Sequence, residues 1–184
     1  MPDPDRDALL IEACLSGDAG LKLYALLAPH LGSTGNDNIA AVFENRGVLV
    51  PCAEQGGYAL ALAAVDADTH RPAWSRASAG YVGASDGWQD FAQHGAMRWT
   101  YAQAGPGNVA LLAEASGQEV TLALAFGRDK EAAATLALSA LLRPFEQVWQ
   151  QNVAAWTEWQ ERSVASIDVA PEYRAALHLS LIHI

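Results

Sequence analysis

Short hydrophobic runs, some of them alternating with polar residues, follow one another over the first two thirds of the chain. Clusters of Gly, Asn, Asp and Pro separate these runs at the spacing typical of antiparallel strands. The pattern predicts strands at residues 8–14, 21–27, 39–44, 48–52, 58–65, 79–83, 97–101, 109–115 and 120–126, with a loop at 32–38. This part of the chain is therefore expected to be all β.

After Gly127 the hydrophobic pattern changes to the 3.6-residue period of a helix. We expect a first helix at residues 129–142, capped by Asp129, and a second helix with Pro144 in its first turn. The apolar face of the second helix carries Phe145, Trp149, Val153, Trp156 and Trp159 or Gln160. Strands followed by helices indicate two separate domains rather than interleaved βαβ units.

Both ends of the sequence are unusual. The chain passes from an acidic turn directly into the strand expected at residues 8–14, which leaves that strand without an upstream partner, so we expect an N-terminal portion to be missing. A linker at residues 163–171 and the opening of a third helix at 172–178 are expected near the other end. The end sequence of a widely used transposase-based sequencing adapter encodes residues 179–184, although a genuine apolar tail is the alternative.

Composition limits the class of protein. A chain of 184 residues that is 51% hydrophobic can bury one sizeable core, which argues against disorder. Its formal charge of -10 repels phosphate backbones and anionic lipids, so neither nucleic acid nor a membrane surface is expected as a partner. We also expect a soluble protein, because no apolar stretch reaches the ~18 residues of a membrane span. Its compartment stays open.

No residue pattern predicts a metal or a cofactor. Cys14 and Cys52 are too few for a ligand cluster, and small buried hydrophobic residues are favoured over a disulfide. His30, although near Asn36 and Asp37, is interpreted as a polar loop residue, since His70 and His94 fall in other loops. The glycine-rich residues 105–108 are interpreted as a hairpin turn, because no helix follows that could form a phosphate cradle.

Several motifs occur in a consistent order. They read LLAPHLG at residues 26–32, GYVGASDGWQD at 80–90, MRWTY at 97–101, GNVAL at 107–111 and AFGR at 125–128. Together they resemble the N-terminal domain of bacterial glucoamylases and glucodextranases. The resemblance spans nearly the whole chain, which gives it more weight than any single motif.

The resemblance implies a mainly β fold, an antiparallel supersandwich of the galactose-mutarotase type, followed by linker helices and a catalytic α/α toroid. By this resemblance, residues 1–127 are the later part of the sandwich, 128–170 the linker helices and 171–178 the start of the toroid. The two catalytic glutamates of the family, which inverting hydrolysis requires, would lie beyond His178.

The resulting hypothesis is the non-catalytic portion of an exo-acting, inverting glucan 1,4-alpha-glucosidase. Its partner would be an α-glucan or the missing toroid of the same chain. Two alternatives remain, namely a stand-alone carbohydrate-binding sandwich and an interaction module that binds another protein.

Four residues of one motif are candidates for contact with a sugar or with the toroid: Asp86, Trp88, Gln89 and Asp90. An aromatic face can stack on a pyranose ring, while carboxylates and amides can bond its hydroxyls. The favoured alternative is that Trp88 packs inside the sandwich and Asp86 forms a turn with Gly87. An acid/base pair of Asp86 and Asp90 is rejected, because nothing places a substrate between them. The tryptophan stripe of the second helix is interpreted as interdomain packing.

Overall fold

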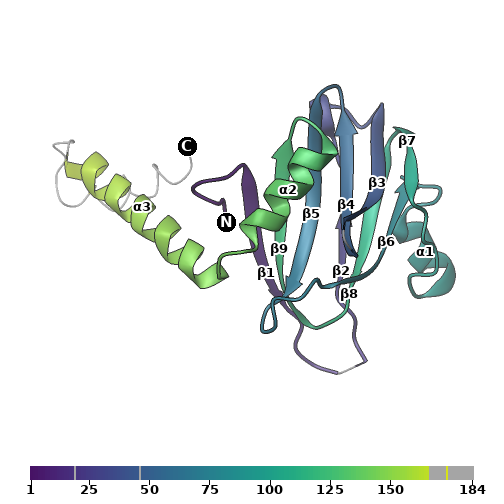
Figure 1. Cartoon of the computed structure of the whole chain (residues 1–184), viewed down its shortest axis with the longest axis horizontal. Coiled ribbons are helices and arrows are strands. Elements are labelled where there is room, and N and C mark those ends of the chain that lie inside the picture. Colours follow the sequence, from purple (N-terminus) through teal and green to yellow (C-terminus); the bar gives the residue numbers. More distant parts are fainter. Residues whose placement is uncertain (19, 46, 166–172, 174–184) are drawn as a thin grey trace.

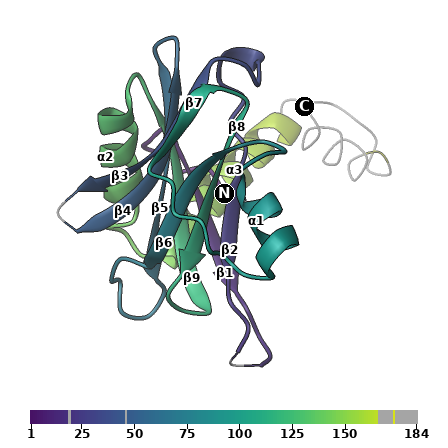
Figure 2. The same cartoon turned by 90° about the vertical axis from the view of Figure 1, so that its right-hand side faces the viewer.

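The computed structural model describes residues 1–18, 20–45, 47–165 and 173. Two antiparallel sheets pack face to face, and a helix lies on the outer side of each (Figures 1 and 2). The larger sheet has the order β1 (Ala8–Cys14), β9 (Glu119–Gly127), β5 (Tyr58–Asp66), β4 (Val48–Gln55), β3 (Asn38–Asn45) and β7 (Gln103–Gly107). The smaller sheet has the order β2 (Tyr24–Leu27), β8 (Val109–Ala115) and β6 (Trp74–Tyr81).

Strand β5 is buried on both of its faces. Leu60 and Leu62 belong to the core between the two sheets, whereas Ala61 and Ala63 belong to the core beneath α2 (Lys130–Ala140). This double burial explains why the sequence of β5 reads as a continuous apolar run instead of an alternating one.

The interface between α2 and the larger sheet consists mainly of small residues. The buried face of α2 carries Ala133, Ala134, Ala137 and Ala140. Gly127, at the end of β9, allows the close approach, because a Cβ there would lie only 2.7 Å from the backbone nitrogen of Ala133. Asp129 caps the helix by accepting the N–H of Ala132 at 2.7 Å, as predicted.

The outer side of the smaller sheet is covered by α1 (Gly87–His94). Gly87 lies against Leu112 of β8, where a Cβ would come within 2.5 Å of the leucine side chain. Phe91 packs edge-on against Tyr24 of β2, with 4.8 Å between the ring centroids. A short 3-10 helix, η1 (Leu31–Ser33), lies in the loop that follows β2.

The long helix α3 (Phe145–Ala165) begins after Pro144 and leads away from the sandwich (Figure 1). Residues 163–165, expected to open a linker, instead continue this helix. The rest of the predicted linker lies outside the described residues, as do the predicted adapter segment at 179–184 and, apart from residue 173, the third helix and toroid start at 171–178.

The structure confirms the predicted fold class, an antiparallel sandwich followed by helices. Strands β1 and β8 have the predicted bounds. Strand β6 begins at Trp74, five residues before the predicted start at 79. Its early part contains Arg76, whose guanidinium lies 2.6 Å from the carboxylate of Glu114 on the neighbouring strand, so this charged residue is paired within the sheet.

Three other predictions were wrong. His94, expected in a loop, is instead the last residue of helix α1. Residues 97–101 are not a strand, because the N–H groups of Trp99 and Tyr101 bond to the side chains of Asp90 and Ser78. Residues 105–107 are not a hairpin turn, since they end β7, which pairs with β3 in one sheet, while β8 lies in the other.

The two cysteines differ in environment. Cys52 is buried and Cys14 is exposed at the end of β1, opposite Glu119, and both are free thiols. The expectation of small buried residues therefore holds for Cys52 and was wrong for Cys14, which occupies the last position of an edge strand.

The close packing of α2 on the larger sheet can be tested by enlarging one of its buried side chains. Replacing the fully buried Ala137 by Leu should destabilise the chain by about 1–3 kcal/mol, because the helix would have to move off the sheet. Denaturant unfolding measures this change. Ala154→Leu, at an exposed position of α3, serves as the matched control. Equal stability of the two variants would show that α2 can be displaced without cost.

Candidate functional site

Asp86 begins α1 as its N-cap residue and is buried. Its Oδ1 accepts the backbone N–H groups of Trp88 and Gln89 at 2.8 and 3.0 Å, and its Oδ2 accepts the N–H of Gly83. Both carboxylate oxygens are therefore bonded to the backbone of the turn itself. Asp86 fixes where the helix starts.

Asp90, one turn further along α1, is only 1% exposed. Its Oδ2 accepts the N–H groups of Arg98 and Trp99 at 2.7 and 2.8 Å, while its Oδ1 lies 2.8 Å from Nδ1 of His94. Burial alone would raise the pKa of Asp90, but these hydrogen bonds and the proximity of His94 outweigh it and hold the pKa below its ordinary value. Asp90 therefore ties the segment after α1 back onto the helix.

Trp88 lies at the surface with 68% of its area exposed, so the interpretation that it packs inside the sandwich was wrong. Gly87 is the residue that meets Leu112 of the sheet, and Trp88 next to it is left facing solvent. Gln89 is half-buried. Contact with a sugar or a toroid stays a prediction for this motif. The available groups are those of Trp88 and Gln89, since the oxygens of Asp86 and Asp90 are already bonded.

His30, Asn36 and Asp37 lie in the loop around η1, and Asn38 organises that loop. The buried side chain of Asn38 accepts the N–H of Leu31 at 3.1 Å and donates to the carbonyls of Thr34 and Asn36 at 2.9 and 3.0 Å. The sequence analysis missed this residue. A signal was available, because an asparagine at the end of a polar loop often bonds to nearby backbone groups.

Within the described residues, no group of three or more His, Cys, Asp or Glu side chains could hold a metal ion. The same part of the chain contains no helix that is both long and apolar enough to cross a membrane.

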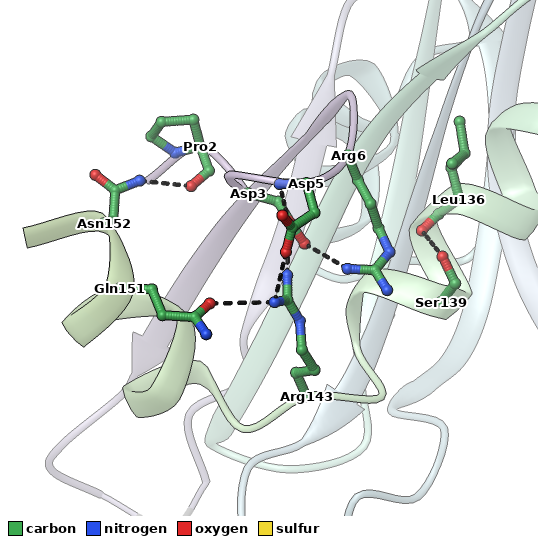
Figure 3. Close-up of polar contacts among 9 residues, drawn as sticks. All are labelled: Pro2, Asp3, Asp5, Arg6, Leu136, Ser139, Arg143, Gln151 and Asn152. Carbon is green, nitrogen blue, oxygen red and sulfur yellow. Dashed lines mark hydrogen bonds and ion pairs between the residues drawn. The ribbon is translucent and has the colours of Figure 1, made fainter. Parts of the chain in front are cut away.

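The corner between α2 and α3 is tied to the beginning of the chain by Arg143 (Figure 3). Nη2 of Arg143 donates to Asp3 at 2.7 Å, and Nη1 donates to Asp5 at 2.9 Å and to Gln151 at 3.2 Å. Asp3 and Arg143 are 140 residues apart in the sequence. This ion-pair cluster, which we call the Arg143 clamp, was not predicted, because no local spacing connects residues so distant.

The chain start is fixed on both sides of the clamp. The amino group of Met1 donates to the carbonyl of Leu10 at 2.6 Å, and the N–H of Leu10 donates to the carbonyl of Met1 at 2.7 Å. On the other side, the side-chain amide of Asn152 donates to the carbonyl of Pro2 at 2.8 Å. The first turns of α3 and the edge strand β1 are thus joined through residues 1–5.

Charge pairing in the clamp sets the ionisation of Asp3. Burial alone would raise the pKa of its carboxyl, but the N–H of Asp5 and the guanidinium groups of Arg143 and Arg6 hold the pKa below its ordinary value. The hydrogen bond to Asp3 in turn raises the pKa of Arg143. Both groups are therefore charged at neutral pH.

Beyond the clamp, α3 exposes an apolar stripe formed by Trp149, Val153, Trp156 and Trp159. Trp156 and Trp159 contact each other edge-on, with 5.6 Å between their ring centroids. The predicted amphipathic pattern is present. Its interpretation as interdomain packing stays a prediction.

The role of Asp90 can be tested by substitution. Asp90→Ala should lower the free energy of unfolding by about 1–3 kcal/mol, because it removes the buried carboxylate that accepts the N–H groups of Arg98 and Trp99. Thermal or denaturant unfolding checks this expectation. Gln93→Ala, an exposed substitution in the same helix, should change stability little. An Asp90→Ala chain as stable as the original would contradict the bracing role.

Because the Arg143 clamp depends on the negative charge of Asp3, we expect the folded chain to lose stability in acid. Because the pKa of Asp3 is lower in the folded chain, the stabilisation by its ion pair is complete above the unfolded pKa of about 3.9 and is lost as the pH falls through the folded value. We expect denaturation at decreasing pH to show this loss, and Asp3→Asn to have a weaker pH dependence. Glu161→Gln, at an exposed position in α3, is the control. An unchanged pH profile in Asp3→Asn would exclude the clamp as its source.

Comparison with known proteins agrees with this architecture. Residues 1–161 match the family described as glucodextranase, domain N. The fold is similar to that of a bacterial glucoamylase solved in complex with acarbose, with 24% sequence identity and a TM-score of 0.79. The match covers 88% of this chain and 24% of that glucoamylase chain. No curated protein matches the sequence. Since the family match extends over most of the sequence, the chain belongs to the family described as glucodextranase, domain N.

Proposed function

We propose that this chain is the non-catalytic portion of a glucoamylase-like enzyme that removes glucose from the ends of α-glucans with inversion. In this proposal the sandwich supports and orients a catalytic toroid of the same polypeptide. The observation that carries the proposal is the family match over residues 1–161, together with a fold similar to one quarter of a glucoamylase chain.

The state of the acidic residues supports a non-catalytic role for the candidate motif. Inverting hydrolysis needs one carboxylic acid at the leaving oxygen and one carboxylate that activates water. Asp86 and Asp90 are both buried, and their oxygens accept hydrogen bonds from neighbouring groups of the protein. Neither is placed to exchange a proton with a substrate.

The Arg143 clamp supports the orienting role. It holds the first turns of α3 against residues 1–5, so the direction in which α3 leaves the sandwich is fixed by the pairing of Arg143 with the buried Asp3 and by the bonds around it. The exposed tryptophans further along α3 would then be presented to the next domain at a defined angle. Such aromatic residues are enriched where domains and subunits meet.

A carbohydrate-binding sandwich is the second candidate, and the exposure of Trp88 favours it. An indole ring with most of its area in solvent is available to stack on a sugar. An interaction module is the third candidate. It is favoured by the same exposed stripe of α3, which could pack against another protein instead of a toroid.

An activity assay tests the leading proposal. The purified chain, incubated with maltoheptaose, should release no glucose, because it would lack the two catalytic glutamates, whereas an active glucoamylase in the same assay should release it. Glucose release by the chain itself would refute the proposal.

Sequencing of the DNA on both sides of this reading frame provides an independent test. It should reveal upstream strands and a downstream helical toroid with two glutamates. Stop codons on both sides of the frame would instead favour one of the two binding modules.

A further inference from the structure

A groove with a volume of about 600 Å³ lies at one end of the sandwich, and its lining includes no residue of α1 or of the Arg143 clamp. Its lining comes from the η1 loop on one side and from the ends of β5 and β9 on the other: His30, Leu31, Gly32, Ser33, Tyr58, Ala59, Phe126 and Gly127. The volume falls within the range of small-molecule sites, which is roughly 300–1,000 Å³.

Two aromatic residues on neighbouring strands line the groove. Phe126 of β9 pairs directly with Leu60 of β5, and Tyr58 precedes Leu60 by two residues, so Tyr58 and Phe126 share one face of the sheet as diagonal neighbours. Their exposed fractions are 63% for Tyr58 and 41% for Phe126. Leu60 beside them belongs to the buried cluster against which Leu31 of the η1 loop packs, so the two aromatic residues continue the apolar surface beyond the core.

The opposite side of the groove is held in place by internal contacts. Asn38 fixes the backbone of the η1 loop through its three hydrogen bonds. Gly32 and Ser33 both have left-handed backbone conformations, with φ of 64° and 63°. Gly32 also packs against Gln55, whose oxygen would lie 2.6 Å from a Cβ at that position. This wall of the groove is therefore fixed by contacts within the protein.

The chemistry of the lining selects a neutral ligand. No Lys, Arg, Asp or Glu is among the described residues that line the groove, so there is no charged partner for an anion or a cation. Aromatic faces, the hydroxyls of Tyr58 and Ser33 and the ring of His30 suit a molecule with both C–H faces and hydroxyl groups. We propose that this groove binds a gluco-oligosaccharide, a site that rests on the proposed role in α-glucan metabolism and is separate from Trp88.

Calorimetry with maltoheptaose and the complete 184-residue chain tests the site. The chain should bind maltoheptaose, and Tyr58→Ala and Phe126→Ala should each weaken binding by about tenfold, since each removes an aromatic surface that would cover the sugar. Tyr101→Ala is the matched control, because Tyr101 is an exposed tyrosine that does not line the groove. Thermal unfolding of each variant verifies that it is folded.

The binding of maltoheptaose by these variants distinguishes the groove from the surface at Trp88. Loss of binding in Tyr58→Ala and Phe126→Ala with normal binding in Tyr101→Ala supports the groove. Absence of maltoheptaose binding by the unaltered chain overturns it, and so does binding that is lost in Trp88→Ala but kept in Tyr58→Ala. The glucose-release assay reports separately on the proposed function, because a chain that neither binds maltoheptaose nor releases glucose would lose the groove and keep the non-catalytic role.

Discussion

Burial of strands β5 and β9 on both faces is the constraint on which the rest of this structure depends. Large residues of these strands fill the space between the two sheets, while alanines on the opposite face admit α2 at close range. The position of α2 then determines where Arg143 lies, and Arg143 determines how α3 leaves the sandwich. A sequence pattern in the middle of the domain thereby controls the direction of a helix outside it.

Prediction from the sequence was most accurate where a single signal, such as a turn or a helix cap, sets the end of an element. Strands β1 and β8 have their predicted bounds because apolar runs there are bounded by clear turn signals, and α2 begins at a recognisable cap. It was least informative around α1. The helix is short and half polar, and Asp90 draws the N–H groups of residues 98 and 99 out of any strand. When a side chain accepts the backbone N–H groups of a segment in place of a neighbouring strand, the sequence shows no periodic pattern that would reveal it.

The candidate site shows the same limit. The motif at residues 80–90 was correctly singled out, but the roles within it were not separable from sequence, because two aspartates four residues apart can serve as ligand contacts or as backbone anchors. In the structure, Asp86 and Asp90 are both buried and bonded to backbone N–H groups, so both are backbone anchors. The Arg143 clamp and the groove beside η1 could not be predicted at all, since each joins segments whose proximity results only from the completed fold.

The pairing of β1 with β9 has a consequence for how the chain folds during synthesis. Ala8 pairs with Ala125, so the pairing of β1 with β9 can form only after β9 has left the ribosome. Contacts so distant in sequence require closure of a long loop and slow the folding of a domain. Until then the edge of β1 that pairs with β9 is open to aggregation, and a chaperone that shields this edge would raise the yield of folded protein.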